Sequence, residues 1–535
     1  MKKTYYSALV ILAFIIQQAP TLAQPIIPNL DASFNGNGIS PFNFFQSFEP
    51  GRMAIQADGK ILVGGYGNNN APDPFDGILY RLNVDGTLDA SFADGGIHVL
   101  DVDGGSDAIR DILVLPNNKI LVLLESAFRT ILVQLNPDGS KDTSFGNEGF
   151  GFVPTEQFEF CSNILREADG HFLILSDQVV QGNRFIGTVR RCNPDGTFDT
   201  TYGNGGTVKL VLDLSNDFSR LFGCLQPDGK LLVSGNFGQL TSSAFPVVRL
   251  NPDGSFDTSF SGDGIYIKPL GNATYSAIAN CITVDATGKI YVGGLAPNTT
   301  SVLMTILSLT PSGGVNGTFG TFGIARVPFT LYASCNKLII QPDGKILAGG
   351  FTYNNPPTNT SLAYSRLNTN GTPDLSFGDQ FGRFVSTINA PFDLQIVLDM
   401  ELQGDGKLVS MAWVNETINL GQPGNDASCY MLRYLTDITI KAEEPSLVFQ
   451  HAEVFPNPIL NEPATLTYTL DKSCAVTLYL YDINGRELAT MVKAENHPAG
   501  INHMNFQLPT QLTPGTYFIG ISDGLTQKVV KLIKG

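Results

Sequence analysis

Aspartates recur along this chain of 535 residues in loops whose composition would suit a metal ion. In the stretch NPDGSFDTSF, residues 251–260, Asp253 and Asp257 stand close together, and Asp263 follows. Carboxylate and carbonyl oxygens are the ligands that Ca²⁺ prefers. However, the chain has no D-x-D-x-D-G run with a distal Glu, and Asp and Asn in such loops usually accept hydrogen bonds from nearby backbone N–H groups. We therefore interpret these aspartates as turn residues, and we expect neither a bound metal nor a cofactor.

Histidine and cysteine, the other residues that carry chemistry, form no known catalytic pattern. The five histidines form no H-E-x-x-H motif and follow no repeat, standing at positions 98, 171, 451, 497 and 503. No C-x-x-C pair, G-x-S-x-G elbow or phosphate-binding loop occurs either. The sequence therefore names no catalytic residue, although carboxylates brought together from distant segments would escape such a search.

Four of the seven cysteines occupy equivalent places in repeated segments. Cys161, Cys224, Cys281 and Cys335 each precede a turn glycine by an odd number of residues. Equal parity places them on the same face of equivalent strands. We interpret them as small buried residues and expect no obligatory disulfide.

Two motifs alternate along the chain about every 58 residues. The first has a D-x-S-F core, and its aromatic residue recurs at positions 34, 92, 145, 202, 260, 319 and 377. The second is a turn followed by an apolar run, and its copies span residues 57–65, 117–124, 168–175, 227–235, 287–294, 342–350 and 404–411. Such regular self-similarity indicates a repeat architecture.

Each repeat has room for four strands and little else. Between residues 261 and 310 we expect strands near Gly264–Leu270, Ser276–Asp285, Lys289–Gly294 and Val302–Leu309. The tight turns between strand-like runs contain Asp-Gly or Thr-Gly, where glycine accepts the positive φ that such turns need. Four-stranded units in tandem predict a β-propeller.

The two ends of the repeat region are complementary halves of one motif. Residues 28–38, PNLDASFNGNG, supply the second half, and residues 429–437, CYMLRYLTD, supply the first. An open solenoid would instead end in altered capping repeats. We therefore predict a closed ring of seven four-stranded blades. The D-x-S-F loop is interpreted as the joint between neighbouring blades, with its aromatic side chain filling the gap.

The repeat motifs resemble a known family. R-L-N-P-D-G-S-x-D-x-S-F-G and Q-P-D-G-K-I-L-V-G-G are similar to the delta-60 repeats of secreted bacterial proteins. The resemblance covers about residues 28–437 and implies a β-propeller. Residues 308–320 and the turn at 117–119 depart from the pattern but keep its phase.

The repeats stop near Ile438, and a small module of alternating strands follows. We expect the propeller over residues 24–437, a linker over 438–452, and an immunoglobulin-like β-sandwich over 453–535. The strands predicted within this module are TLTYTL 465–470, AVTLYLYD 475–482, INHMNFQL 501–508 and TYFIGIS 516–522.

The C-terminal module is similar to the type A sorting domain of the type IX secretion system. The matching features are FPNP 455–458, DINGRE 482–487, LTPGTY 512–517 and a terminal KVVKLIKG. The resemblance implies contact with the secretion machinery, a Bacteroidetes-type source, and frequent removal of the domain, with the passenger released or attached to the cell surface. It assigns the sorting signal to Gly515, Tyr517, Lys528, Lys531, Lys534 and Gly535. A generic carbohydrate-binding sandwich is the alternative.

The N-terminus has the features of a secretory signal over residues 1–23. Lys2 and Lys3 precede an apolar run, and small residues lead to a cleavage site between Ala23 and Gln24. The apolar run is too short for a transmembrane anchor. The net charge of −16 and the lack of a basic block argue against nucleic acid. We expect an exported monomer, secreted or attached to the outer cell surface.

The loops opposite the repeated motifs, which we expect to join the third and fourth strands of each blade, vary most. The longest span residues 66–77, 351–362 and 413–427, in three blades that a closed ring makes neighbours. Tyr66, Phe75, Tyr353 and Trp413 interleave there with Asn and Asp, a composition suited to stacking on a sugar or peptide. We therefore predict a binding or display protein that recognises an extracellular glycan or protein. The alternatives are a secreted enzyme acting on extracellular polysaccharide, and loop growth without function.

Overall fold

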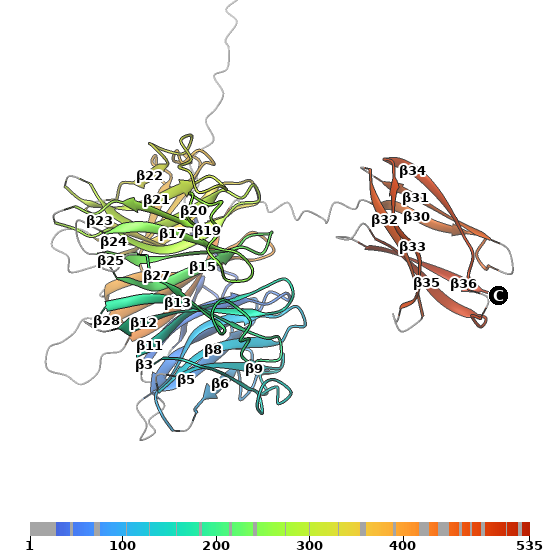
Figure 1. Ribbon diagram of the computed structural model, residues 1–535, viewed down its shortest axis with the longest axis horizontal. Coiled ribbons are helices and arrows are strands. Elements are labelled where there is room, and N and C mark those ends of the chain that lie inside the picture. The colour runs from blue at the N-terminus through green and yellow to red at the C-terminus, as the bar shows by residue number, and fades with distance from the viewer. Residues whose placement is uncertain are drawn as a thin grey trace, which may run out of the picture. The chain divides into compact units, whose positions relative to one another are not determined.

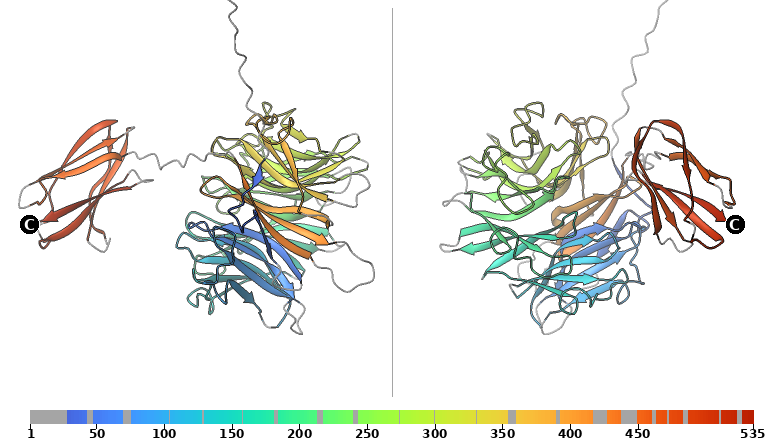
Figure 2. Two further views of the ribbon diagram at one scale, coloured as in Figure 1. Left: turned by 180° about the vertical axis from the view of Figure 1, so that it is seen from behind. Right: turned by 45° about the vertical axis from the view of Figure 1, so that its right-hand side comes forward.

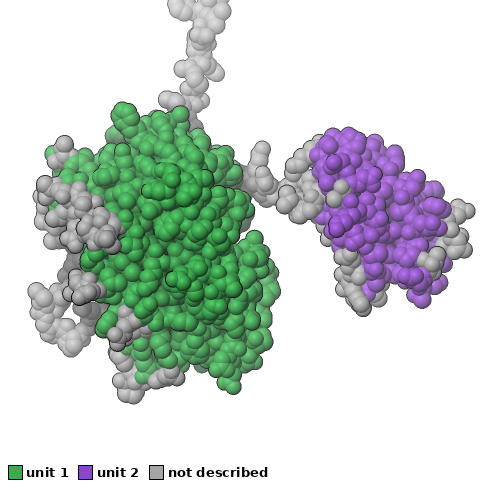
Figure 3. Space-filling model, in the orientation of Figure 1, with its two compact units in different colours: residues 1–438 green, residues 439–535 purple. Residues whose placement is uncertain are grey.

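The chain folds into two compact units, residues 1–438 and 439–535 (Figure 3). The computed structural model describes residues 28–436 and 449–535 except residues 43–46, 69–74, 103, 128, 157, 181–183, 213–216, 239–242, 273, 299, 330, 354–359, 389–391, 417–426, 460–462, 471–472, 483–486, 510 and 523–526. The regular elements within this part of the chain are all β-strands. In the same residues, no helix has the length and hydropathy of a membrane span.

The first unit is built from antiparallel sheets of four strands that follow one another along the chain (Figure 1). We refer to each four-stranded group as a blade. Blade 1 comprises β3 (Ser47–Ile55), β4 (Ile61–Asn68), β5 (Asp76–Leu82) and β6 (Ile97–Leu100); blade 2, β7 (Asp107–Val114), β8 (Ile120–Ser126), β9 (Arg129–Leu135) and β10 (Phe150–Val153); blade 3, β11 (Glu159–Arg166), β12 (Phe172–Val180), β13 (Arg184–Cys192) and β14 (Thr207–Leu210); blade 4, β15 (Phe218–Leu225), β16 (Leu231–Phe237), β17 (Ala244–Leu250) and β18 (Ile265–Pro269).

The later blades continue this pattern. Blade 5 comprises β19 (Ile278–Val284), β20 (Ile290–Pro297), β21 (Val302–Leu309) and β22 (Ile324–Val327); blade 6, β23 (Tyr332–Ile340), β24 (Ile346–Tyr353), β25 (Thr360–Leu367) and β26 (Arg383–Ser386); blade 7, β27 (Phe392–Leu402), β28 (Leu408–Glu416) and β29 (Ala427–Leu435). Blade 7 is completed by the N-terminal strands β1 (Asn29–Leu30) and β2 (Ile39–Phe42), which both pair with β29. Blades 5 and 6 are further joined by one parallel pair, Val302 with Tyr332.

The first strands of the blades form the inner wall of the unit. Each contacts the first strand of the following blade, from β3 through β27, and β27 contacts β3. In Figure 2 the blue strands of blade 1 accordingly lie beside the orange strands of blade 7. The all-β propeller class predicted from the sequence is confirmed.

One strand of each repeat was predicted to belong to the wrong blade. The strand near Gly264–Leu270 was expected to begin a new blade, yet β18 is the outer, fourth strand of blade 4 and pairs with β17. The D-x-S-F loop therefore connects the third and fourth strands of one blade. The inner strand is the one before the Asp-Gly turn, because only that strand contacts its counterparts in both neighbouring blades.

The D-x-S-F motif still joins blades, through contacts rather than chain connectivity. In blade 4, Arg249 on β17 donates from Nε to Asp257 at 2.7 Å, and its guanidinium lies 4.6 Å from the Phe260 ring centre. The same arginine donates to the carbonyl of Pro311 in blade 5. Ser261, directly after the aromatic, donates its backbone N–H to Ser312 of blade 5 at 3.0 Å. Phe260 itself packs against Gly313, where a Cβ would come within 2.8 Å of the ring.

The two ends of the repeat region rebuild this junction between blades 7 and 1. Arg433 donates from Nε to Asp31 at 2.8 Å, and its guanidinium lies 4.7 Å from the Phe34 ring centre. Arg433 also donates to the carbonyl of Val84 in blade 1, and Lys407 pairs with Asp31 at 3.3 Å. Asp31 and Arg433 are both buried. The split motif is therefore restored by residues from opposite ends of the propeller sequence.

Polar side chains bind the inner strands to one another along the axis. Each inner strand carries a β-bulge. In blades 2, 3, 5, 6 and 7 a side chain at or just after the bulge bonds to the next blade. Asp111 accepts from the backbone N–H of Ile164 at 2.9 Å, and Asp399 accepts from Met53 at 3.3 Å and from Lys337 Nζ at 2.6 Å. These bonds satisfy carboxylates that burial would otherwise penalise.

One side chain crosses the axis. The guanidinium of Arg52, from blade 1, lies 5.7 Å from the Phe222 ring centre in blade 4, on the far side of the ring. It also attracts the carboxylates of Asp111 and Asp399. The axis at this level is therefore occupied by charged and aromatic side chains.

The second unit has two sheets around one apolar core. The first is β30 (Phe449–Phe455), β31 (Ala464–Leu470) and β34 (Gly500–Phe506); the second is β33 (Glu487–His497), β32 (Cys474–Tyr481), β35 (Gly515–Ser522) and β36 (Gln527–Lys534). Leu466 and Phe506 of the first sheet and Leu478 and Ile519 of the second belong to the same buried cluster. β30 begins at Phe449, inside the segment predicted to be linker, and β33 and β36 are strands that the sequence did not predict.

Asp31→Ala is expected to destabilise the propeller strongly, because it leaves the buried Arg433 without its anion. Removal of one partner from a buried pair costs about 3 kcal/mol. The only tryptophan, Trp413, lies on β28 of blade 7, so its fluorescence during urea unfolding reports the closing blade. Asp263→Ala, which removes an exposed turn carboxylate bonded to Ile265, is the matched control and should cost about 1 kcal/mol or less. Equal losses in the two variants would contradict the proposed role of Asp31.

Glu401 should make the stability of the propeller fall as the pH rises through neutrality. Burial, with repulsion from Asp399 and Asp111, raises the pKa of this carboxyl to about 7, against the attraction of Lys337. The folded chain therefore holds a proton that the unfolded chain, with a pKa of about 4.3, has released. The contribution is fully present below the unfolded pKa and is lost as pH rises through about 7.

Glu401→Gln removes this titration and should flatten the pH dependence. The quantity to measure is the urea midpoint of each protein from pH 5 to 8.5. The midpoint of the variant minus that of the wild type should increase as pH rises. Burial also raises the pKa of Asp177, to about 6, but that carboxyl is present in both proteins and cancels. Glu148→Gln, at an exposed turn, is the control, and a difference that does not change with pH would refute the assignment.

Candidate functional site

The propeller has two chemically different faces. The Asp-Gly turns between the first and second strands and the D-x-S-F loops between the third and fourth lie at one end of the blades, which we call the motif face. The connections between the second and third strands, and those from one blade to the next, lie at the opposite end, which we call the loop face. The motif face repeats the same contacts, whereas the loop face varies from blade to blade.

An aromatic pocket opens on the loop face between blades 5 and 6. It has a volume of about 310 Å³ and is lined by Tyr275, Thr300, Ser301, Val302, Leu331, Tyr332 and Tyr353. Tyr275 and Leu331 are more than two-fifths exposed, so apolar surface faces solvent at the mouth. This size lies at the lower end of the range for small-molecule sites, and the lining combines aromatic rings with hydroxyl groups.

Two asparagines hold one wall of the pocket. Asn272 Oδ1 accepts the backbone N–H groups of Thr274 and Tyr275, each at 2.9 Å. Asn298 Oδ1 accepts those of Thr300 and Ser301, each at 2.8 Å. These are Asx turns, in which the side chain replaces a backbone acceptor. Asn272 Nδ2 also donates to the carbonyl of Asn298 at 3.1 Å, so the two turns form one braced unit.

The opposite wall is a stack of aromatic rings. Tyr332 and Tyr353 face each other across a strand pair with ring centres 4.6 Å apart and planes 13° from parallel. Phe351 stacks on the same Tyr332 at 6.0 Å. Burial raises the pKa of both Tyr332 and Tyr353, helped by the phenol of Tyr353 in the first case and by that of Tyr275 in the second. Both hydroxyls therefore stay protonated at neutral pH.

The predicted residues Tyr66 and Phe75 meet at a separate place on blade 1. Their ring centres lie 5.6 Å apart at nearly a right angle. The Tyr66 hydroxyl donates to the exposed carboxylate of Glu49 at 2.6 Å, and burial with this bond raises the pKa of Tyr66 to about 12. The Arg110 guanidinium lies 5.9 Å from the Tyr66 ring centre. This pair is engaged by local partners, and none of the described contacts joins it to Tyr353.

Trp413 lies within strand β28 and pairs with Ile396 and Cys429. It is half-buried, and its indole Nε1 has no hydrogen-bond acceptor among the described residues. Most of the three long loops, residues 69–74, 354–359 and 417–426, lies outside the described part of the chain. The structure therefore brings Tyr66 and Phe75 together, places Tyr353 in the pocket, and leaves Trp413 in the sheet.

Sequence reasoning missed Tyr275 and Tyr332. Tyr275 lies in the connection from blade 4 to blade 5, and Tyr332 begins β23, so neither belongs to the three long loops that the sequence singled out. The aromatic residue in the stretch NATYS and the one in LYASC were the available signals. Their convergence with Tyr353 depends on the parallel contact between β21 and β23, which no repeat motif encodes.

The axial carboxylates are poorly placed for catalysis. Asp111 accepts from Ile112, Asn163 and Ile164, and Asp399 accepts from Met53, Met400 and Lys337. A general acid or base needs a lone pair or proton directed at a substrate. The oxygens of these two carboxylates instead accept hydrogen bonds from neighbouring strands.

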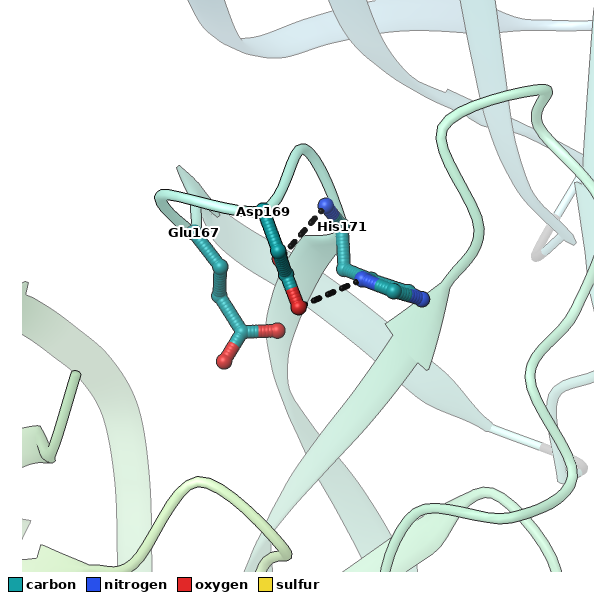
Figure 4. Close-up of side chains that lie close together, drawn as sticks. All are labelled: Glu167, Asp169 and His171. Carbon is teal, nitrogen blue, oxygen red and sulfur yellow. Dashed lines mark hydrogen bonds and ion pairs between the residues drawn. The ribbon is translucent and has the colours of Figure 1, made fainter. Parts of the chain in front are cut away.

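Two clusters in the described part of the chain bring three potential metal ligands within 4.8 Å of one another. Asp76, Asp101 and Asp107 form the first, on the loop face between blades 1 and 2. There Asp107 accepts a hydrogen bond from the backbone N–H of Val102, and Asp101 accepts one from the backbone N–H of Gly104. Such bonds are typical of carboxylates that stabilise a loop. Glu167, Asp169 and His171 form the second, on the motif face of blade 3 (Figure 4).

The predicted sorting residues lie on the last two strands of the second unit. Lys534 Nζ donates to the carbonyl of Leu512 at 2.6 Å, and the Tyr517 hydroxyl donates to that of Thr513 at 2.8 Å. Gly535 donates its N–H to Ile459. Gly515 begins β35, Lys528 and Lys531 lie on β36, and Lys531 is exposed. The predicted cleavage site at Ala23 and Gln24 lies outside the described residues.

Asn457 of the FPNP segment connects that segment to the final strand. Its Oδ1 accepts the N–H of Ile533 at 2.8 Å, and its Nδ2 donates to the carbonyl of Lys531 at 3.1 Å. Ile459 N–H also donates to the carbonyl of Ile533 at 2.7 Å. These bonds connect the segment to β36. Phe455, the first residue of the segment, is 77% exposed.

The chain is similar, at low sequence identity, to several solved structures. Prolyl oligopeptidase B from Galerina marginata is 13% identical, with a TM-score of 0.38, and the match covers 80% of this chain and 56% of that one. Chaetomium thermophilum Sqt1, bound to the N-terminus of ribosomal protein L10, is 12% identical, with a TM-score of 0.39 and coverage of 74% and 99%. PorZ, a surface component of the type IX secretion system of Porphyromonas gingivalis, is 10% identical, with a TM-score of 0.18 and coverage of 91% and 82%. No curated protein matches the chain.

Family models match both units. The model described as a domain of unknown function (DUF5122) beta-propeller matches residues 56–92, 115–145, 226–260 and 341–377. The model described as a secretion system C-terminal sorting domain matches residues 453–535. The two resemblances stated from the sequence are therefore confirmed. The chain is a secreted β-propeller protein that carries DUF5122 repeats and ends in a type IX secretion system sorting domain, which directs it to the cell surface or the medium.

Proposed function

We propose that this protein is a binding or display protein that recognises an extracellular glycan through the pocket of Tyr275, Tyr332 and Tyr353. The observation that carries the proposal is the stacked tyrosine pair beside hydroxyl side chains on the loop face. Sugars present both apolar C–H faces and hydroxyl groups, so a site for them needs flat rings and hydrogen-bonding partners together. The pocket supplies both.

The braced wall and the small size of the pocket support the same function. The braced Asn272 and Asn298 turns fix the wall before a ligand arrives, and a preformed site loses less entropy on binding. A protein ligand would need a larger surface than this pocket offers. The alternative of an enzyme acting on extracellular polysaccharide is not favoured by the axial carboxylates, because each is bonded to a neighbouring strand. We also propose that the mature chain begins at Gln24 and acts as a monomer with seven blades.

Truncating the tyrosine stack should abolish glycan binding. The mature protein is screened on a glycan array, and the double variant Tyr332→Ala/Tyr353→Ala should lose at least about tenfold in affinity for any glycan bound, since truncated aromatic anchors typically cost 2 kcal/mol or more. Tyr66→Ala/Phe75→Ala, which removes the other aromatic pair of the loop face, is the matched control and should bind within about twofold of wild type.

Two results would overturn this assignment. Failure of the mature protein to bind any glycan would remove the carbohydrate ligand. Binding that survives in Tyr332→Ala/Tyr353→Ala but is lost in Tyr66→Ala/Phe75→Ala would move the site to blade 1. Urea midpoints of both variants establish that neither loss reflects unfolding.

Asn457 should be required for efficient export. Asn457→Ala removes both bonds between its side chain and β36, which loosens the strand that carries the terminal lysines. In cells with a type IX system, the variant should accumulate in the periplasm, and its extracellular fraction, measured by immunoblot, should fall severalfold. Thr465→Ala, which removes an exposed bond to Asn505 in the same unit, is the control. Normal export of Asn457→Ala would contradict the role of this contact.

A further inference from the structure

Blade 3 departs from the repeat at two neighbouring positions of its Asp-Gly turn. Blades 1, 4, 6 and 7 have the pattern Q-x-D-G-K there, at residues 56–60, 226–230, 341–345 and 403–407. Blade 3 has E-A-D-G-H, residues 167–171. Glutamate thus replaces glutamine, and histidine replaces lysine, on either side of the retained Asp169. Both replacements introduce a side chain that ligates metals.

The ordinary turn is electrically balanced. In blade 4, Lys230 pairs with Asp228 at 3.7 Å and with Asp257 at 3.0 Å, and Arg249 pairs with the same Asp257. Two cations therefore face two carboxylates, and the neutral Gln226 adds no charge. The equivalent lysines of blades 1, 6 and 7 reach the D-x-S-F aspartate in the same way.

The turn of blade 3 lacks this balance. Its carboxylates are Glu167, Asp169 and Asp199, and the cation that pairs with them is Arg191, bonded to Asp199 at 2.6 Å. Among the described residues, one arginine thus faces three carboxylates, and histidine stands where other blades have lysine. The pair between Arg191 and Glu167 is long, at 3.8 Å. A divalent cation would supply the charge that the lost lysine no longer provides.

The three side chains of this turn converge. Figure 4 shows the Glu167 and Asp169 carboxylates and the His171 ring on one side of the turn. His171 Nδ1 lies 3.0 Å from Asp169 Oδ2. Two ligands about 2.0 Å from a tetrahedral zinc ion are themselves about 3.3 Å apart, so this spacing requires little adjustment. Glu167 is 94% buried, and its Oε2 accepts no hydrogen bond in the described part of the chain.

We propose that Glu167, Asp169 and His171 bind a Zn²⁺ ion on the motif face of blade 3. One imidazole nitrogen with two carboxylates is a donor set that suits zinc, with the fourth position open to water. Glu167 Oε2, which accepts no hydrogen bond among the described residues and has a long ion pair with Arg191, provides a ligand atom that is already buried. The ion takes the place of the ion pairs that lysine makes in other blades, and the site is independent of the glycan pocket on the opposite face.

The repeat itself provides the control variant. Glu167→Gln/His171→Lys converts the turn of blade 3 to the pattern of blades 1, 4, 6 and 7, and the introduced lysine has Asp169 and Asp199 as partners. This variant should fold with a urea midpoint at least equal to that of the metal-free wild type. His503→Ala removes an exposed histidine of the second unit and tests for unrelated metal binding.

The test measures zinc directly on the untagged mature chain. After equilibrium dialysis against ZnCl₂, the wild type and His503→Ala should each retain one zinc ion per chain, whereas Glu167→Gln/His171→Lys should retain none. Zinc should also raise the thermal midpoint of the wild type by about 2 °C or more at saturation, and CaCl₂ should not. The proposal fails if the wild type retains no zinc, or if Glu167→Gln/His171→Lys retains as much. It also fails if Ca²⁺ stabilises the wild type as well as Zn²⁺ does.

Discussion

A buried ion pair between a strand arginine and the D-x-S-F aspartate holds the propeller together. The arginine lies over the aromatic ring of the motif and donates to a carbonyl of the next blade, so one guanidinium connects three partners. Arginine suits this role because its planar group offers five donors and stacks on aromatic faces. Asp31 and Arg433 make the same contacts across the closure. The ring is thus closed by the interaction that joins its blades elsewhere.

This constraint separates the two faces of the propeller. In blades 1, 3, 4, 6 and 7 the motif face keeps the arginine and the aspartate in register with the aromatic and a close glycine, so these loops have little freedom to change. Gly313 shows how tight the fit is, because its φ of 87° and its contact with Phe260 exclude a side chain. Among the residues of the loop face that the structure describes, the Asn-braced turns and the tyrosine stack form a pocket. Sequence variation that serves binding is therefore expected on the loop face, opposite the D-x-S-F motif.

Local patterns predicted the repeated features but not the places where blades meet irregularly. The spacing of the aromatics, from Phe34 to Phe377, identified the propeller, and the complementary termini identified the partners now seen as Asp31 and Arg433. The strand near Gly264–Leu270 was assigned to the wrong blade, because an outer strand and an inner strand both follow turns and both alternate. The pocket was found only through Tyr353. Tyr275 reaches it from the connection before β19 and Tyr332 from the start of β23, and their meeting depends on tertiary contacts that a single sequence does not display.

Departures from the repeat are informative because the regular copies show which residues the fold alone requires at each position. In blade 5, Ser308 and Asn316 replace the arginine and aspartate together, and a neutral bond of 3.1 Å joins them. In blade 2, Gln134 replaces the arginine alone, and Lys119 still balances Asp142 at 2.6 Å. Both blades thus stay electrically satisfied, as buried groups must. Blade 3 changes in the opposite sense, because the lysine is lost and a carboxylate is gained at the same turn. Glu167 is buried there with one long ion pair to Arg191, and the proposed zinc site rests on this departure from the repeat.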